Sequence, residues 1–335
     1  MNLFRIVLKR TNKRKYNDSP CRDAFAVLLF VFLLPYVIAY LWGHVGEESV
    51  LLFGYPEEKE EWADTEYEVR LQGKWGSKQM TMQDYLIQKL KLVMPYDEED
   101  GMSYELEALK AQAVLLRTQV WEMYLADGDV VLQDDTFFYH VGNNYNQEEE
   151  ALYEAAVCET DGICLSYDGK PVKAAYFPVS NGRTRNAAEV VQNGSYPYLV
   201  SVECRQDILA KNFQSRVSFS KEEYCRLVKQ GFPIDIENEE IWKRLELTYD
   251  STEYVIEAAV NGLSCNGEIF RDMFGLSSSC FYAEWDDESV TFFVRGVGHG
   301  LGMSQYGANE RAISGETFDE ILENYFFQAE LVKIE

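Results

Sequence analysis

A histidine set among glycines marks the part of this chain best suited to chemistry. His299, one of three histidines, lies in the stretch GVGHGLGMSQYGA, residues 296–308. An unperturbed imidazole titrates at a pH of about 6.5, so it can act as acid, base, hydrogen-bond partner or metal ligand near neutrality. Glycine reaches backbone angles closed to other residues. The stretch therefore predicts a shaped loop, which either packs around a satisfied histidine or forms one wall of a binding site.

A second polar segment follows a predicted strand. Its side chains are small or polar and can hydrogen-bond the hydroxyl or acetamido groups of a sugar; they are Ser180, Asn181, Gly182, Arg183 and Thr184. The alternative is a simple turn stabilised by its own hydroxyl groups, with an exposed arginine.

The clearest predicted helix covers residues 103–129. Apolar residues recur there at steps of three and four, which places them on one face; they are Leu106, Leu109, Ala113, Leu116, Val120 and Tyr124. Arg117 and Thr118 lie beside this face. We expect either a snorkelled arginine with a threonine bonded to the helix backbone, or an internal ion pair.

The elements predicted around these segments mix helices and strands without a regular βαβ repeat. Helices are expected over residues 80–95 and 146–157, after a capping box at Ser220 and Glu223, and from about Met303 and Phe318. Asp168-Gly169 predicts a hairpin within residues 163–177. Further strands are expected at residues 65–73, 196–203, 244–250, 253–260, 281–286, 290–296 and near Leu331. The predicted fold class is therefore α+β, with a binding cleft.

The N-terminal region differs from the rest of the chain. Residues 24–42 carry no charge, and a helix of that length can cross a hydrocarbon layer of about 30 Å. Basic residues dominate before it, which orients the N-terminus to the cytoplasm. We predict a basic tail (1–23), a transmembrane anchor (24–42), a stalk (43–63) and an extracytoplasmic domain (64–335), that is, a single-pass cell-membrane protein. A cleaved signal peptide is the alternative, but no A-x-A-like site follows the apolar stretch.

Charge and cysteine content narrow the range of ligands. The chain has 31 basic and 56 acidic residues, a net charge of −25, and such a surface repels nucleic acid. A neutral or cationic ligand, such as a polysaccharide, fits better.

The number of cysteines after the predicted anchor is even. The sequence therefore allows either disulfide bonds or free thiols in this part of the chain. Ser304 near His299 would suggest a hydrolase pair, but no G-x-S-x-G elbow accompanies it, so acyl transfer is not predicted.

Three segments together resemble a known family of bacterial cell-wall proteins. They are LEALKAQAVLLRT, AAYFPVSNGRTRNAAEV followed by PYLVSVE, and GVGHGLGMSQYGANERAISGETFDEILENYF. In sequence, order and spacing they are similar to the stage II sporulation protein D / LytB family, over about residues 65–335. The resemblance implies a lytic transglycosylase that cleaves the link between N-acetylmuramic acid and N-acetylglucosamine without water, on glycan strands stripped of peptides. It also implies work beside a cell-wall amidase and other engulfment proteins.

The resemblance implies one catalytic acid, a glutamate directly before Met-Pro, and here this chain departs from the family. The corresponding position is Val93, in LVMP, and valine cannot transfer a proton. Three explanations stay open. The chain is a non-catalytic relative that binds glycan and stimulates or scaffolds an amidase; a carboxylate of the following acidic segment, such as Glu99, has replaced the acid; or the register differs and Glu105 or Glu107 is the acid. Whether the protein is an enzyme is therefore left open.

The remaining groups implied by the family line the same cleft. The predicted substrate-binding residues are Arg117, the five residues 180–184, and His299, Gly300, Ser304, Gln305 and Tyr306. Some relatives carry zinc, but His140 is the only other histidine considered as a partner for His299. No metal or other cofactor is therefore predicted.

Overall fold

The computed structural model describes Asp64 and residues 67–74, 76–96, 103–127, 131–133, 147–191, 195–232 and 238–334. The described residues form a mixed α+β fold, which confirms the predicted class. Helices in this part of the chain are α3 (Met82–Val93), α4 (Leu106–Asp127), α5 (Gln147–Cys158), α6 (Ala187–Val190), the 3₁₀ helix η3 (Arg205–Leu209), α7 (Lys221–Gly231), α8 (Asn238–Ile241), α9 (Gly267–Met273), α10 (Gln305–Ile313) and α11 (Phe318–Tyr325).

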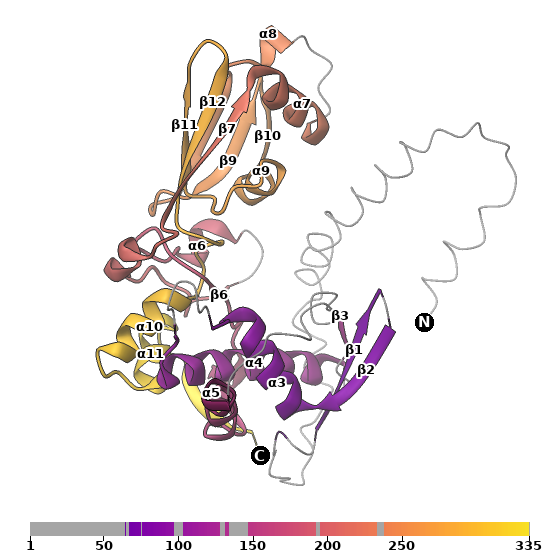
Figure 1. Cartoon of the computed structure of the whole chain (residues 1–335), viewed down its shortest axis with the longest axis vertical. Helices are drawn as coiled ribbons and strands as arrows, with labels where there is room; N and C mark the ends of the chain where they lie inside the picture. Colours follow the sequence, from indigo (N-terminus) through magenta and orange to yellow (C-terminus); the bar gives the residue numbers. More distant parts are fainter. Residues whose placement is uncertain are drawn as a thin grey trace, which may run out of the picture. The chain divides into compact units, whose positions relative to one another are not determined.

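The strands of the described residues pair into small sheets rather than one large one (Figure 1). One sheet has the order β2 (Gly76–Thr81), β1 (Glu68–Gly73), β3 (Val131–Gln133), and another β14 (Glu330–Lys333), β4 (Ile163–Tyr167), β5 (Lys170–Pro171). Two more have the orders β10 (Leu263–Asn266), β9 (Val255–Val260), β8 (Leu245–Tyr249) and β11 (Phe281–Trp285), β12 (Ser289–Arg295), β7 (Gln214–Ser220). A two-stranded parallel pair joins β6 (Tyr176–Phe177) to β13 (Met303–Ser304).

Helix α4 is the centre of the helical part, in contact with α3, α5, α10 and α11 (Figure 1). The predicted apolar face of this helix is too narrow, because α4 packs between two hydrophobic clusters. Leu109, Ala113 and Leu116 belong to one cluster, while Val114 and Leu115 belong to the other. A helix that is covered on both sides has no solvent-exposed face along its middle turns. The polar residues in these turns are therefore buried too.

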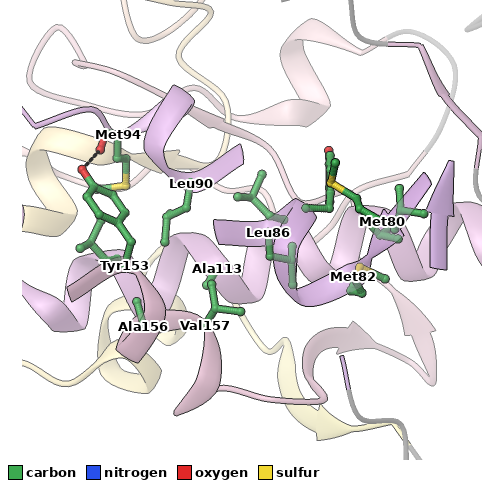
Figure 2. Packing of buried hydrophobic residues seen from close by; sticks show 14 of the residues in the cluster. Met80, Met82, Leu86, Leu90, Met94, Ala113, Tyr153, Ala156 and Val157 are labelled. Atoms are coloured by element: carbon green, nitrogen blue, oxygen red, sulfur yellow. Dashed lines mark hydrogen bonds between the residues drawn. The ribbon is translucent and has the colours of Figure 1, made fainter. Parts of the chain in front are cut away.

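The first of these clusters fixes the end of α3. Leu86 and Leu90 of α3 pack toward α4 and α5, as Figure 2 shows. At the last turn, Tyr153 Oη donates to the main-chain oxygen of Met94 at 2.7 Å. Pro95 follows, and the residue before a proline is disfavoured in helical angles, so the helix ends where predicted.

The third hydrophobic cluster belongs to α7, α9 and the sheets of β7 to β12. Its centre is aromatic: the Phe270 ring stacks on Phe274 at 4.6 Å and on Phe281 at 5.5 Å between centroids. The capping box predicted at Ser220 opens α7, since Ser220 Oγ accepts from the Glu223 amide at 3.2 Å. This cluster supports the strand β12 that leads into residues 296–304.

Two local predictions have different outcomes. The hairpin at Asp168-Gly169 is confirmed, and both residues have positive φ, 52° and 72°, as its tight turn requires. The strand predicted at residues 196–203 is wrong. Its backbone turns, with the Leu199 amide bonded to the Tyr196 oxygen at 2.9 Å. Apart from an isolated bridge between Glu203 and Arg183, it pairs with no strand of the described residues.

The predicted localisation at the cell membrane is corrected. Among the helices of the described residues, none combines the length and the apolar character needed to cross a bilayer. The predicted tail (1–23), anchor (24–42) and stalk (43–63) lie outside the described residues.

Candidate functional site

The histidine-bearing segment, residues 296–304, is here called the glycine loop. Its glycines at 296, 298, 300 and 302 all have positive φ. A Cβ added to Gly302 would lie 2.0 Å from the main-chain oxygen of Ala175, closer than any real contact allows. Glycine is therefore required for this loop to lie on the chain around residue 175, and the expected shaped loop is present.

His299 is partly buried within this loop. Its Nδ1 accepts from the Leu301 amide at 3.1 Å, so a neutral ring carries its proton on Nε2. Burial lowers the pKa of His299, while the negative charge of Glu268 opposes that shift. The ring packs against Phe177, with centroids 5.6 Å apart. His299 is thus a neutral, oriented hydrogen-bonding group at pH 7 rather than a cation.

Residues 180–184, here called the polar turn, are held by their own side chains. Asn181 donates from Nδ2 to the Thr252 oxygen at 2.6 Å, and its amide donates to Tyr254 Oη at 3.2 Å. Gly182, with φ 108°, donates its amide to Ser180 Oγ at 3.0 Å. Ser180 and Thr184 are buried. Only Arg183 has an exposed side chain, and it pairs with Glu203 at 2.8 Å.

The structure brings the polar turn and the glycine loop together. Val179 and Val297 exchange backbone hydrogen bonds at 3.1 and 2.7 Å. The Arg185 amide donates to the Gly300 oxygen at 2.7 Å. Segments far apart in the sequence therefore form one junction.

The end of α3 reaches the same junction. Gln305, which begins α10, donates from Nε2 to the main-chain oxygen of Val93 at 3.0 Å and to Gln112 Oε1 at 3.1 Å. Gln112 is fully buried, and its Nε2 has no partner among the described residues. Position 93 thus lies directly against the segment that follows the glycine loop. Tyr306 continues that segment and donates its amide to the Pro178 oxygen at 3.0 Å.

The predicted acids lie in different surroundings. Glu107 accepts from Lys110 Nζ at 2.7 Å and from the Phe318 amide at 2.8 Å, where it caps the start of α11. Glu105 has an exposed side chain, and its amide bonds to Asn309 Oδ1 at 2.8 Å. Glu99 lies outside the described residues. Since Glu107 serves a helix end, its geometry matches a structural residue.

Arg117 lies apart from this junction, in the protein interior. Its side chain is fully buried, and Nη2 contacts Asp64 Oδ2 at 2.6 Å. Nη1 donates to the Ile163 oxygen at 3.1 Å and Nη2 to the Val157 oxygen at 3.2 Å. The internal ion pair is therefore the correct alternative, and the snorkelled arginine is wrong. Thr118 does bond back along the helix, to the Val114 oxygen at 2.7 Å.

Sequence reasoning missed a buried arginine at the junction. Arg185 Nε contacts Asp250 Oδ2 at 2.7 Å, and its Nη1 donates to Glu268 Oε1 at 3.0 Å and to the His299 oxygen at 3.3 Å. Its guanidinium also lies 4.9 Å from the centre of the Tyr254 ring. The only signal was the second arginine of N-G-R-T-R, which has nothing in the local pattern to separate it from Arg183.

Glu268 is the carboxylate whose charge acts on His299. It lies on α9, outside every segment selected from the sequence, and accepts from Ser279 Oγ at 2.5 Å and Arg271 Nη1 at 3.0 Å, besides Arg185. Two guanidinium groups and a hydroxyl therefore hold the Glu268 carboxylate in place.

No group of three or more potential metal ligands occurs among the described residues. The cysteines at 158, 164, 204, 225, 265 and 280 are free thiols. His140 lies outside the part of the chain that the structure describes.

We compared the chain with known protein families and proteins. A family model described as stage II sporulation protein matches residues 73–167. Stage II sporulation protein D of Bacillus subtilis is 30% identical over 262 residues, which cover 73% of this chain and 72% of that protein. Its counterpart in Bacillus amyloliquefaciens is 29% identical over 263 residues, with coverage of 73% and 72%. A protein named amidase enhancer from Bacillus subtilis is 26% identical over 286 residues, covering 71% of this chain and 39% of that protein. With a relative this similar over most of both chains, the protein belongs to the stage II sporulation protein D family.

Proposed function

We propose that this protein binds the glycan strands of peptidoglycan at the junction of the polar turn, the glycine loop and the end of α3, and that it does not cleave them. Family membership supports a role at the cell wall. The junction offers phenolic hydroxyl, amide and guanidinium groups, which can hydrogen-bond the hydroxyl and acetamido groups of a sugar. Among the binding candidates, Arg183 has an exposed side chain, and the side chains of Asn181, His299 and Tyr306 are partly exposed.

The hydrogen bond between Gln305 and Val93 carries the non-catalytic half of this proposal. The main-chain oxygen of Val93 accepts from Gln305, the residue that follows the glycine loop, and the family resemblance expects the acid at position 93. Cleavage of a glycosidic bond needs a group that protonates the leaving oxygen, and valine has none. Of the two candidate acids in the described residues, Glu107 caps a helix and Glu105 lies at the start of α4 with an exposed side chain.

The test uses glycan strands stripped of their stem peptides. We expect the full-length protein to sediment with the strands and to leave them intact. Mass spectrometry of the soluble fraction would reveal 1,6-anhydromuramyl ends if the bond were cleaved. Such ends would overturn the non-catalytic half of the proposal, whereas a lack of sedimentation would overturn glycan binding itself.

We propose in addition that glycan binding serves to stimulate a cell-wall amidase. The similarity to a protein named amidase enhancer supports this role. The experiment measures release of stem peptides from intact peptidoglycan by a purified amidase, with and without this protein. An unchanged rate at saturating protein would reject the stimulatory role and leave binding intact.

A further inference from the structure

A buried aspartate connects the two segments of the junction. Asp207, on η3, is fully buried. Its Oδ2 accepts from the Ser180 amide at 2.6 Å and from Ser304 Oγ at 2.6 Å. Ser180 begins the polar turn, and Ser304 ends the glycine loop. One oxygen atom therefore bonds to both segments at once.

Each serine also forms a hydrogen bond within or next to its own segment. Ser180 Oγ accepts from the Gly182 amide at 3.0 Å, within the polar turn. Ser304 caps α10 and accepts from the Gly307 amide at 3.3 Å. Both serines are fully buried, so neither can touch a glycan. The two serines instead link Asp207 to the neighbouring residues that can contact the glycan.

Burying a carboxyl group to join the two segments lowers the stability of the fold. Its second oxygen, Oδ1, has no hydrogen-bond partner among the described residues. Burial raises the pKa of Asp207, and the hydrogen bonds from Ser304 and Ser180 oppose that shift. A buried polar atom without a partner is destabilising, and no salt bridge joins Asp207 to a cation within the described residues. Residues that break a stability rule in this way are concentrated at functional sites.

The missing side chain of Gly307 leaves room for Asp207. A Cβ added to Gly307 would lie 2.8 Å from Asp207 Oδ1 and 2.4 Å from Tyr325 Oη. The absence of a side chain at Gly307 thus lets α10 approach both groups. Tyr325 Oη has its own partner in Cys204 Sγ, 3.6 Å away.

We propose that Asp207 is a positioning residue of the glycan-binding site, which holds the polar turn and the glycine loop in register through Ser180 and Ser304. This inference rests on the proposed function. Asp207 does not contact the glycan. It sets the spacing of the two segments that do.

The test compares Asp207→Ala with Asp207→Asn. The alanine variant loses the acceptor for both serines, and we expect it to sediment with stripped glycan about tenfold less tightly, equivalent to about 1.4 kcal/mol. The asparagine oxygen can accept both bonds, and its amino group replaces the oxygen that lacks a partner. We expect Asp207→Asn to restore binding to within about threefold of the wild type, a difference below 1 kcal/mol.

A destabilised control separates positioning from general loss of stability. Val228 is fully buried in the cluster around α7, and Val228→Ala lowers the melting temperature without touching either segment. Assays run well below the lowest melting temperature should show normal binding in Val228→Ala and weak binding in Asp207→Ala. Equal losses in both variants, or full binding in Asp207→Ala, would overturn the inference.

A second variant covers the case in which Asp207→Ala does not fold. Ser304→Ala removes one of the two bonds, and we expect binding about threefold to tenfold weaker, with partial loss of the α10 cap. Unchanged binding in Ser304→Ala would then overturn the inference. If the wild type itself does not sediment with glycan, the proposed function fails, and that outcome is distinct from a failure of the Asp207 variants.

Discussion

Gln305 Nε2 lies 3.0 Å from the main-chain oxygen of Val93, and the same Nε2 lies 3.1 Å from Gln112 Oε1. Three elements therefore meet at position 93: the end of α3, the middle of α4 and the start of α10. The unused donor of Gln112 lies in the same place. A buried donor without an acceptor is uncommon in a folded protein.

This geometry predicts that Val93→Glu gains the ability to cleave glycan. The new carboxyl would stand at the position where the family resemblance expects the acid, in a residue whose main-chain oxygen bonds to Gln305. We expect anhydromuramyl ends by mass spectrometry with Val93→Glu and none with the wild type. The change should also lower stability by about 1–3 kcal/mol, since a carboxyl replaces an apolar group in partly buried surroundings.

The matched control is Val93→Gln, which has the same shape and no acid. Products from Val93→Glu alone would assign the activity to the carboxyl group. If neither variant forms products while both still bind glycan, position 93 is not the place of the acid.

A second prediction concerns the close approach of Gly302 to Ala175. Gly302→Ala should lower stability by about 3 kcal/mol or more, because the new methyl group meets a main-chain oxygen and the residue keeps a positive φ. Chemical denaturation measures this loss. Gly315, with φ 94° and no atom near its missing Cβ, provides the control. Gly315→Ala reports backbone strain alone, so similar losses in the two variants would contradict the packing argument.

The histidine predicts a pH dependence of stability. Burial holds the pKa of His299 below its ordinary value, which is about 6.5 in an unfolded chain. As the pH falls below about 6.5, the unfolded chain binds a proton that the folded protein resists, so folding stability is lost as the pH falls through this range.

His299→Gln removes this titration and should lose less stability than the wild type between pH 7.5 and 5.5. Thermal unfolding at both pH values measures the difference. Parallel losses in the two proteins would show that His299 titrates alike in the folded and unfolded states.

The two arginines of N-G-R-T-R should behave differently when replaced by alanine. Arg185→Ala leaves Asp250 buried without its partner, and breaking such a pair costs about 3–5 kcal/mol. Arg183→Ala removes an exposed ion pair, which contributes little to stability. Arg183→Ala should instead weaken glycan binding.

Arg216, exposed on β7, gives a control with the same change in charge. Arg216→Ala should leave glycan binding unchanged while Arg183→Ala reduces it. Equal effects would mean that net charge, not the polar turn, determines binding.

Local patterns determined much of this protein in advance. The hairpin at Asp168-Gly169, the cap at Ser220 and the glycine-rich bend around His299 depend on residues a few positions apart, so the sequence by itself predicts them. The same holds for the α+β class, which follows from the order of the elements.

Only the tertiary structure decided which polar side chains are buried and which groups they bond to. Arg117 and Arg185 are each bonded to carboxylates distant in the sequence, Asp64 for one and Asp250 with Glu268 for the other. Asp207 joins two serines that no periodicity connects. Burial and long-range hydrogen bonds set these roles, and both depend on how separate segments pack in space rather than on the residue types along the chain.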